Sequence, residues 1–207
     1  GKNINKKSGS NHIYKTFKKL KSFDYLISFD GDADRVIIAK KNYGIIESEK
    51  LALIFAKYFS TKKRNKLNIV GTEISNPWLK EQLKKIKIDF VKSKVGDRNV
   101  IKKQIINKSI FGFETSGHFS FLNSMDGIYT SVLFLNVMKK KPQIIDQILL
   151  QEINYKQIVI KIIPNKYKNI SKYLNNLKNL KKVKIIKRKS IWEDVIKIYI
   201  FYKKDFS

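Results

Sequence analysis

Three carboxylates stand at alternate positions in the segment FDGDADR, directly after an apolar run. They belong to Asp30, Asp32 and Asp34. If the chain stays extended there, alternate side chains point the same way, and three negative charges repel one another. A divalent cation removes that repulsion, and Mg²⁺ takes oxygen ligands while keeping room for a phosphate oxygen. The segment therefore predicts a magnesium site, with an acidic surface turn as the plainer alternative.

Two other kinds of carboxylate site begin in a similar way. An EF-hand calcium loop fits poorly, because Arg35 occupies the position that requires glycine and Lys41 the position of the final glutamate. A dehalogenase-type phosphatase also places an Asp-x-Asp pair after a strand, with the first aspartate as its nucleophile. A magnesium-dependent phosphatase with Asp30 as nucleophile therefore stays open as an alternative enzyme.

A second polar segment, GFETSGH at residues 112–118, carries side chains suited to a hydroxyl-rich ligand. Glu114, Ser116 and His118 alternate, so an extended loop would present all three to one molecule. Sugars need such a mixture of hydrogen-bond donors and acceptors. Taken alone, His118 is more readily explained as an ordinary hydrogen-bonded histidine.

Short apolar runs alternate with stretches of helical periodicity through most of the chain. The runs predict strands at residues 25–29, 36–39, 67–70, 89–91 and 110–113, and the periodic stretches predict helices at 47–59, 77–86, 98–106 and 127–138. This alternation predicts an α/β fold with mixed or parallel sheets and helices. After about residue 152 the pattern changes to strands at 157–163, 183–187 and 195–202 with a lysine-rich helix at 167–180. The change predicts a small α+β domain at the C-terminal end.

The net charge of +27 suggests nucleic-acid binding at first sight. Only four of the 44 basic residues are arginine, however, so 40 are lysine. Dedicated nucleic-acid surfaces favour arginine for bidentate and stacked contacts. Lysine, asparagine and isoleucine all have A/T-rich codons, so genome composition explains the bias. We expect no specific nucleic-acid partner, although a basic nucleic-acid-binding protein remains the non-enzymatic alternative.

The composition also bears on the cellular setting. The chain has no cysteine, which excludes disulfides and thiolate metal sites. No apolar run approaches the ~20 residues that span a bilayer, so we expect no membrane association. No secretory leader is visible either, and we expect a cytoplasmic protein. Nothing in the sequence indicates an oligomeric state.

The segment FDGDADR resembles the magnesium loop of the α-D-phosphohexomutase family, usually D-G-D-G/A-D-R. The resemblance implies that Asp30, Asp32 and Asp34 hold Mg²⁺ together with a phosphoserine from the family's first domain. It implies that Arg35 lies beside that phosphoserine as a supporting catalytic residue. The family's serine lies in an S-x-S-H-N-P-like loop that this sequence does not contain, so we expect the chain to be a fragment that is inactive alone.

The segment GFETSGH resembles the family's sugar loop, G-E-x-S-G-H. The resemblance implies that Glu114 and Ser116 bind sugar hydroxyls and that His118 assists phosphate or hydroxyl contacts. It also implies a sugar phosphate as substrate. Thr115 replaces the glutamine that is more usual in the phosphoglucosamine mutase branch, which leaves the identity of the sugar open.

Further segments resemble that branch, in the family's order. KVGDRNV at residues 94–100 resembles its V-G-D-R-Y-V segment, which implies substrate contacts from Lys94, Asp97 and Arg98. The other similar segments are GKNIN at 1–5, GS at 9–10, GTEISN at 71–76 and DG at 126–127. The branch interconverts glucosamine 6-phosphate and glucosamine 1-phosphate through a phosphoserine and a bisphosphate intermediate. Phosphomannomutases and phosphoglucomutases of the same family are the alternative.

The family's last domain carries a phosphate-binding loop, R-x-S-G-T-E-P. The similar segment here retains Arg188, Ser190 and Glu193, but Ile191 and Trp192 replace the glycine and threonine. A phosphate cradle needs close approach of the backbone, which a β-branched residue hinders. Phosphate binding by Arg188 and Ser190 is therefore one expectation, and a plain loop before a strand is the other.

The resemblance implies a division into three domains. Residues 1–46 would end domain 2 and carry the magnesium loop. Residues 47–151 would form the α/β domain 3 with the sugar-binding loop. Residues 152–207 would form the small α+β domain 4 with the degenerate phosphate-binding loop.

Overall fold

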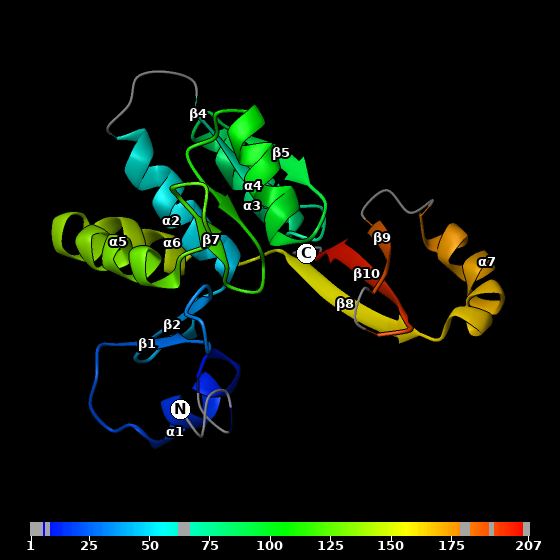
Figure 1. Cartoon of the computed structure of the whole chain (residues 1–207), viewed down its shortest axis with the longest axis horizontal. Helices are drawn as coiled ribbons and strands as arrows, with labels where there is room; N and C mark the ends of the chain where they lie inside the picture. Colours follow the sequence, from blue (N-terminus) through cyan, green and yellow to red (C-terminus); the bar gives the residue numbers. More distant parts are fainter. Residues whose placement is uncertain (1–5, 7–8, 62–66, 179–182, 191–192, 205–207) are drawn as a thin grey trace. The chain divides into compact units, whose positions relative to one another are not determined.

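The computed structural model describes residues 6, 9–61, 67–178, 183–190 and 193–204 (Figure 1). Contacts within the chain divide it into two compact units. The N-terminal unit comprises residues 1–75 and 79–151, and the C-terminal unit comprises residues 76–78 and 152–207. The segments GKNIN at 1–5 and Ile191-Trp192 lie outside the described residues. No helix in the described ranges is long and apolar enough to cross a bilayer.

The first sheet of the N-terminal unit is an antiparallel hairpin with a short third strand. Its order is β1 (Tyr25–Phe29), β2 (Val36–Lys40) and β3 (Gly44–Ile45). Because Phe29 pairs with Val36, residues 30–35 form the tip of the hairpin. The strand at 25–29 was predicted with the right bounds, and all five of its residues are half-buried.

The second sheet has the order β5–β4–β6–β7 and is mixed. Strand β4 (Leu67–Thr72) pairs in parallel with β5 (Ile88–Ser93) and β6 (Gly112–Phe113), whereas β7 (Phe119–Ser120) is antiparallel to β6. The predicted strand at 110–113 is therefore shorter than expected. This mixed sheet, with its helices, confirms the α/β fold class.

Seven α-helices were found in the described residues. They are α1 (Ile13–Lys19), α2 (Ser48–Ser60), α3 (Pro77–Lys85), α4 (Asp97–Ile106), α5 (Gly127–Lys140), α6 (Pro142–Leu149) and α7 (Tyr167–Lys178). Four apolar residues at helical spacing in the second of these are buried, namely Leu51, Ile54, Phe55 and Tyr58. Proline fits at the first helical position of α6 because its missing N–H has no partner there anyway.

Helix α5 positions the hairpin that carries the carboxylate loop. It packs against β1 and β2 and also against α2 and α6. The ring of Tyr25 meets that of Phe134 edge-on, with centroids 5.2 Å apart. Burial of such aromatic pairs stabilises both elements. The hairpin is thereby fixed to the helical part of the same unit.

The C-terminal unit is an antiparallel sheet in the order β8 (Tyr155–Ile162), β10 (Ile196–Lys203), β9 (Val183–Lys189). One face carries the core formed by Ile162, Ile196, Ile198 and Ile200, which packs with Leu174 of α7. The strand and helix pattern predicted after residue 152 is confirmed, and it forms an antiparallel sheet with one helix.

Candidate functional site

The carboxylate loop is bent at the tip of the β1–β2 hairpin. Ala33 has a φ of +59°, and its N–H donates to the Asp30 carbonyl at 3.3 Å. The Arg35 N–H donates to Oδ1 of Asp30 at 3.1 Å. The loop therefore turns, and the expected extended path with alternating side chains is wrong for residues 30–34.

Two of the three aspartates nevertheless converge, and they do so on a histidine. Ligand atoms of Asp30, Asp34 and His118 all lie within 4.8 Å of one another. The His118 Nε2 atom is 3.3 Å from Oδ1 of Asp34. Asp32 is exposed and is not in this group. Within the described residues, the structure thus brings together two of the three predicted ligands and adds an imidazole.

The electrostatics of this group suit a cation. Burial raises the pKa of Asp34, the charges of Asp30 and Asp32 raise it further, and His118 opposes that rise. A divalent ion would relieve the repulsion between the carboxylates. Two carboxylates are the oxygen ligands that Mg²⁺ prefers, and an imidazole nitrogen is a donor to several other divalent metals. The donor set therefore fits a divalent cation.

The predicted sugar loop is a tight turn between β6 and β7. The Gly117 N–H donates to the Glu114 carbonyl at 3.1 Å, and the Glu114 N–H donates to the His118 carbonyl at 2.9 Å. The expected extended loop is therefore wrong here too. The three side chains still face one another, since the Ser116 hydroxyl is 2.7 Å from Nδ1 of His118, and Oε2 of Glu114 is 3.9 Å from the same atom.

These two loops dock on each other through the backbone. The Val36 N–H donates to the Gly117 carbonyl at 3.0 Å, and Arg35 forms an isolated antiparallel bridge with His118. A Cβ atom on Gly117 would lie 2.7 Å from the Val36 carbonyl oxygen. Only glycine allows this close approach of the two backbones. The docking joins two segments that lie about 80 residues apart in the sequence.

A third predicted segment is tied to the same turn. The Gly96 N–H donates to Oε1 of Glu114 at 2.7 Å, directly before α4 begins at Asp97. Lys94, Asp97 and Arg98 are exposed. Sequence reasoning assigned Glu114 to sugar contacts and missed this second role as the anchor of the 94–98 segment. No local signal indicates it, because the two residues are 18 positions apart.

Arg35 also has a partner that sequence reasoning missed. Its Nη1 atom donates to Oδ1 of Asn11 at 3.0 Å, while its Nε atom lies 3.7 Å from Oδ2 of Asp30. Asn11 directly follows the Gly9-Ser10 segment, which was the nearest sequence signal. Arg35 is thus held between the carboxylate loop and the segment before α1.

The start of α5 completes the support of the carboxylate loop. The Gly127 N–H donates to the Ala33 carbonyl at 2.9 Å. A Cβ atom on Gly127 would lie 2.8 Å from the carbonyl oxygens of Ala33 and Arg35. The predicted Asp-Gly segment therefore combines a close backbone contact with an N-cap, because Oδ1 of Asp126 accepts a hydrogen bond from the Tyr129 N–H at 2.8 Å.

We expect Asp126→Ala to lower the free energy of unfolding by about 1 kcal/mol, because a helix N–H loses its side-chain acceptor. Asp126→Asn keeps an acceptor oxygen and serves as the control. It should lower the free energy of unfolding by less than about 0.5 kcal/mol. Urea denaturation followed by circular dichroism measures both. An equal loss in the two variants would show that charge, and not the cap, is what matters.

The predicted phosphate-binding residues lie in the C-terminal unit. Arg188 is in β9, and Ser190 follows that strand. The Ser190 hydroxyl accepts a hydrogen bond from the Glu193 N–H at 3.3 Å. Glu193 in turn forms ion pairs with Lys161 at 2.9 Å and Lys197 at 2.8 Å.

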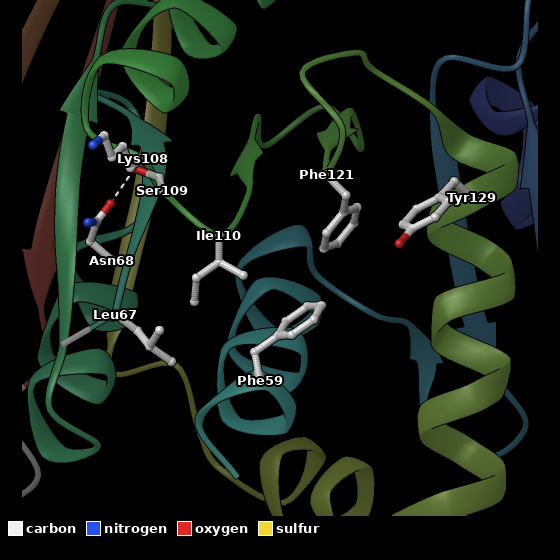
Figure 2. A pocket seen from close by; sticks show the side chains of 8 residues that line it. All are labelled: Phe59, Leu67, Asn68, Lys108, Ser109, Ile110, Phe121 and Tyr129. Carbon is white, nitrogen blue, oxygen red and sulfur yellow. Dashed lines mark hydrogen bonds between the residues drawn. The ribbon is translucent and has the colours of Figure 1, made fainter. Parts of the chain in front are cut away.

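A cavity of about 310 Å³ lies elsewhere in the N-terminal unit. Figure 2 shows the side chains that line it. Phe59 and the facing rings of Phe121 and Tyr129 line one side of it. On the other side Ser109 and Asn68 hydrogen-bond to each other. None of the predicted site residues lines this cavity. The side chains of the two loops, and not this cavity, therefore define the candidate site.

Comparison with known proteins finds relatives by sequence and by fold. Residues 47–155 match the family model described as phosphoglucomutase/phosphomannomutase, alpha/beta/alpha domain III. The phosphoglucosamine mutase of Clostridium tetani is 33% identical over 186 residues, which is 87% of this chain and 40% of that protein. The phosphoglucosamine mutase of Acetivibrio thermocellus is 39% identical over 147 residues, 67% of this chain and 32% of that protein.

A solved structure shows the same fold. A phosphoglucomutase/phosphomannomutase family protein from Burkholderia thailandensis superimposes with a TM-score of 0.75 at 17% identity, over 93% of this chain and 45% of that one. The chain thus spans 40% or less of the two curated relatives and under half of this structure.

Proposed function

The chain belongs to the α-D-phosphohexomutase family, and on that premise we propose that the whole protein is a phosphosugar mutase. We propose glucosamine 6-phosphate and glucosamine 1-phosphate as the pair that it interconverts, through a phosphoserine and a bisphosphate intermediate. The observation that most directly supports this proposal is the docking of the DGDADR hairpin on the GFETSGH turn, with Asp30 and Asp34 beside His118. The names of the two phosphoglucosamine mutase relatives support the choice of sugar. We assign residues 1–46, 47–151 and 152–207 to domains 2, 3 and 4 of that mutase.

Within this proposal Asp30, Asp32 and Asp34 are the ligands of a divalent cation, which we take to be Mg²⁺. When bound, the ion would offset negative charge on the transferring phosphoryl group. Such transfer depends mainly on positioning and charge stabilisation. Arg35 supplies a fixed positive charge next to the loop, held by Asn11 and Asp30.

The sugar contacts fall to the turn and to the segment tied to it. Oε2 of Glu114, the Ser116 hydroxyl and the His118 ring form a compact set of donors and acceptors. The bond from the Gly96 N–H to Glu114 ties the 94–98 segment, which carries Lys94, Asp97 and Arg98, to this turn. These three side chains are exposed, so an incoming ligand can reach them. They supply two positive charges and one carboxylate, a combination that suits an amino-sugar phosphate.

The metal assignment can be tested on the 207-residue chain itself. We expect Asp34→Asn and Asp32→Asn each to weaken binding of Mg²⁺ or Mn²⁺ by about tenfold. Removal of a residue that only hydrogen-bonds to a metal ligand typically lowers metal affinity by that factor, and removal of the ligand itself should lower it at least as much. Asp24→Asn, an exposed aspartate just before β1, is the charge-matched control and should leave the affinity unchanged. Titration calorimetry gives the constants. A wild-type chain without divalent binding at millimolar concentration would contradict the assignment.

The reaction is tested by supplying the chain with a first domain of a relative that carries the serine, fused or as a separate chain. We expect conversion of glucosamine 6-phosphate to glucosamine 1-phosphate. A higher kcat/KM for mannose 6-phosphate would move the assignment to a phosphomannomutase. Hydrolysis of either substrate by the chain alone, abolished by Asp30→Asn, would favour the phosphatase instead.

A further inference from the structure

Helix α5 carries exposed apolar side chains along one side. Ile128, Val132 and Leu135 are 57%, 60% and 41% exposed. Their spacing of four and then three residues places them on one line along the helix, which we call the α5 stripe. Leu122 and Tyr129, close to the start of the helix, are also exposed, at 73% and 39%. Five large apolar side chains are therefore open to solvent between residues 122 and 135.

The opposite side of the same helix is buried within the N-terminal unit. Thr130, Phe134 and Val137 repeat the spacing of the α5 stripe two positions further along, about 200° around the helix. All three are 0% exposed. The helix thus has a buried side and an apolar outer side, a pattern typical of a helix that is covered all round. An exposed apolar patch of this kind marks an interaction surface.

The hairpin that packs against α5 has an open edge. Within the described residues β1 pairs with β2 alone, so the other edge of β1 has no neighbouring strand. All five residues of β1 are half-buried. Unpaired strand edges invite further pairing with protein. Two adjoining elements therefore lack a neighbour, which indicates a folded protein segment as the missing cover and not an ion or a sugar.

Charge and length decide between two kinds of protein cover. The net charge of +27 opposes association of two copies of this chain, because like charges repel. The chain matches 40% of the Clostridium tetani mutase and 32% of the Acetivibrio thermocellus mutase, so more than half of each relative has no counterpart here. The parts of a multidomain protein bury surface where they meet. These two facts favour the unmatched portion of the mutase over a second copy.

We propose that the α5 stripe is the docking surface for the portion of a phosphosugar mutase that this chain does not match. Ile128, Val132 and Leu135 become buried when that portion is present, and they are exposed in this chain because it is absent. The burial of these three side chains holds the portion against the same helix that supports the β1–β2 hairpin and its carboxylate loop. The proposal rests on the proposed function only in taking that portion from a mutase.

The test measures how fast an introduced thiol reacts with the disulfide reagent DTNB. The chain has no cysteine, so each variant carries a single thiol. Val132→Cys probes the α5 stripe, and Ile105→Cys on α4 is the matched control, because Ile105 is an apolar helix residue of the same unit with 55% exposure. Each variant is studied as the 207-residue chain and as a fusion to the unmatched portion of the Clostridium tetani mutase, with any cysteine of that portion replaced by serine. We expect the fusion to slow the reaction of Val132→Cys at least about tenfold, and that of Ile105→Cys less than about twofold.

Equal rates for Val132→Cys in the chain and in the fusion would overturn the proposal. A reaction in the chain alone that slows as its concentration rises would overturn it as well, because a second copy would then cover the stripe. Leu135→Cys repeats the measurement at a second position, and circular dichroism confirms that each protein is folded. The rates require neither sugar nor metal. Protection in an inactive fusion would contradict the mutase proposal alone, and free reaction in an active fusion would contradict the docking alone.

Discussion

Gly117→Ala is expected to destabilise the N-terminal unit by about 2–5 kcal/mol. The φ of Gly117 is +98°, a region that costs an L-residue ~1–2 kcal/mol. The new Cβ atom would also lie 2.7 Å from the Val36 carbonyl oxygen and 2.8 Å from Cδ1 of Ile37. Relief of that overlap costs a further ~1–3 kcal/mol, because the backbone of β2 has to move. Urea unfolding of the variant measures the sum.

Gly44→Ala separates the two causes. Gly44 has a similar φ of +106°, but its Cβ atom would meet nothing within 4 Å. This control should therefore lose only the conformational part, about 1–2 kcal/mol. We also expect divalent-metal affinity to fall in Gly117→Ala and to hold in Gly44→Ala, since only the first disturbs the docking of the two loops. Equal losses of stability and equal metal affinities would show that the docking carries no such role.

The regular elements were predictable because their signals are local. The apolar run at residues 25–29 has the length and composition of a strand, and the helix at 48–60 shows its stripe in four residues. The run could not show how deeply the strand is buried. Burial of β1 depends on what packs over it from elsewhere, and all five of its residues are half-buried.

The loops show a different limit of sequence reasoning. Alternate spacing predicted that the aspartates converge on an extended chain, yet Ala33 takes a φ of +59° and the loop turns. That conformation is uncommon for a residue other than glycine, so composition did not indicate it. Asp30 and Asp34 still meet because of the turn, while Asp32 is exposed and lies outside their group.

Contacts between distant segments were the part that no local pattern could supply. The bond from Gly96 to Glu114 and the bond from Arg35 to Asn11 each join residues that are many positions apart. The resemblance to the family pointed to nearly all of these segments, but a motif does not say which atoms meet. The role of Glu114 as the acceptor for Gly96 therefore emerged only from the structure.

Because the proposed function adds a sugar contact to this structural role, we expect Glu114→Ala to be the most damaging single substitution in the chain supplemented with a first domain. The change removes the acceptor of the Gly96 N–H at 2.7 Å and the carboxylate oxygen that lies 3.9 Å from His118. A part-buried donor left without a partner, or a lost sugar contact at the buried Glu114, each costs ~1–3 kcal/mol, so kcat/KM should fall about ten- to a hundredfold or more. Glu193→Ala should cost less, since its carboxylate sits in an exposed ion pair.

Glu114→Gln distinguishes the role of Glu114 as acceptor for the Gly96 N–H from its proposed contact with the sugar. The amide oxygen of glutamine still accepts from Gly96, so the 94–98 segment should stay in place while the negative charge is lost. We expect Glu114→Gln to recover the stability of wild type but only part of its kcat/KM for glucosamine 6-phosphate. Full recovery of both stability and kcat/KM would show that Glu114 only anchors the 94–98 segment. A larger loss of kcat/KM in Glu193→Ala than in Glu114→Ala would show that the loop of Glu193 contributes more to activity than the loop of Glu114. The same measurements with mannose 6-phosphate show whether Glu114 contributes to the choice of sugar, because a contact that selects the amino sugar should matter less for mannose.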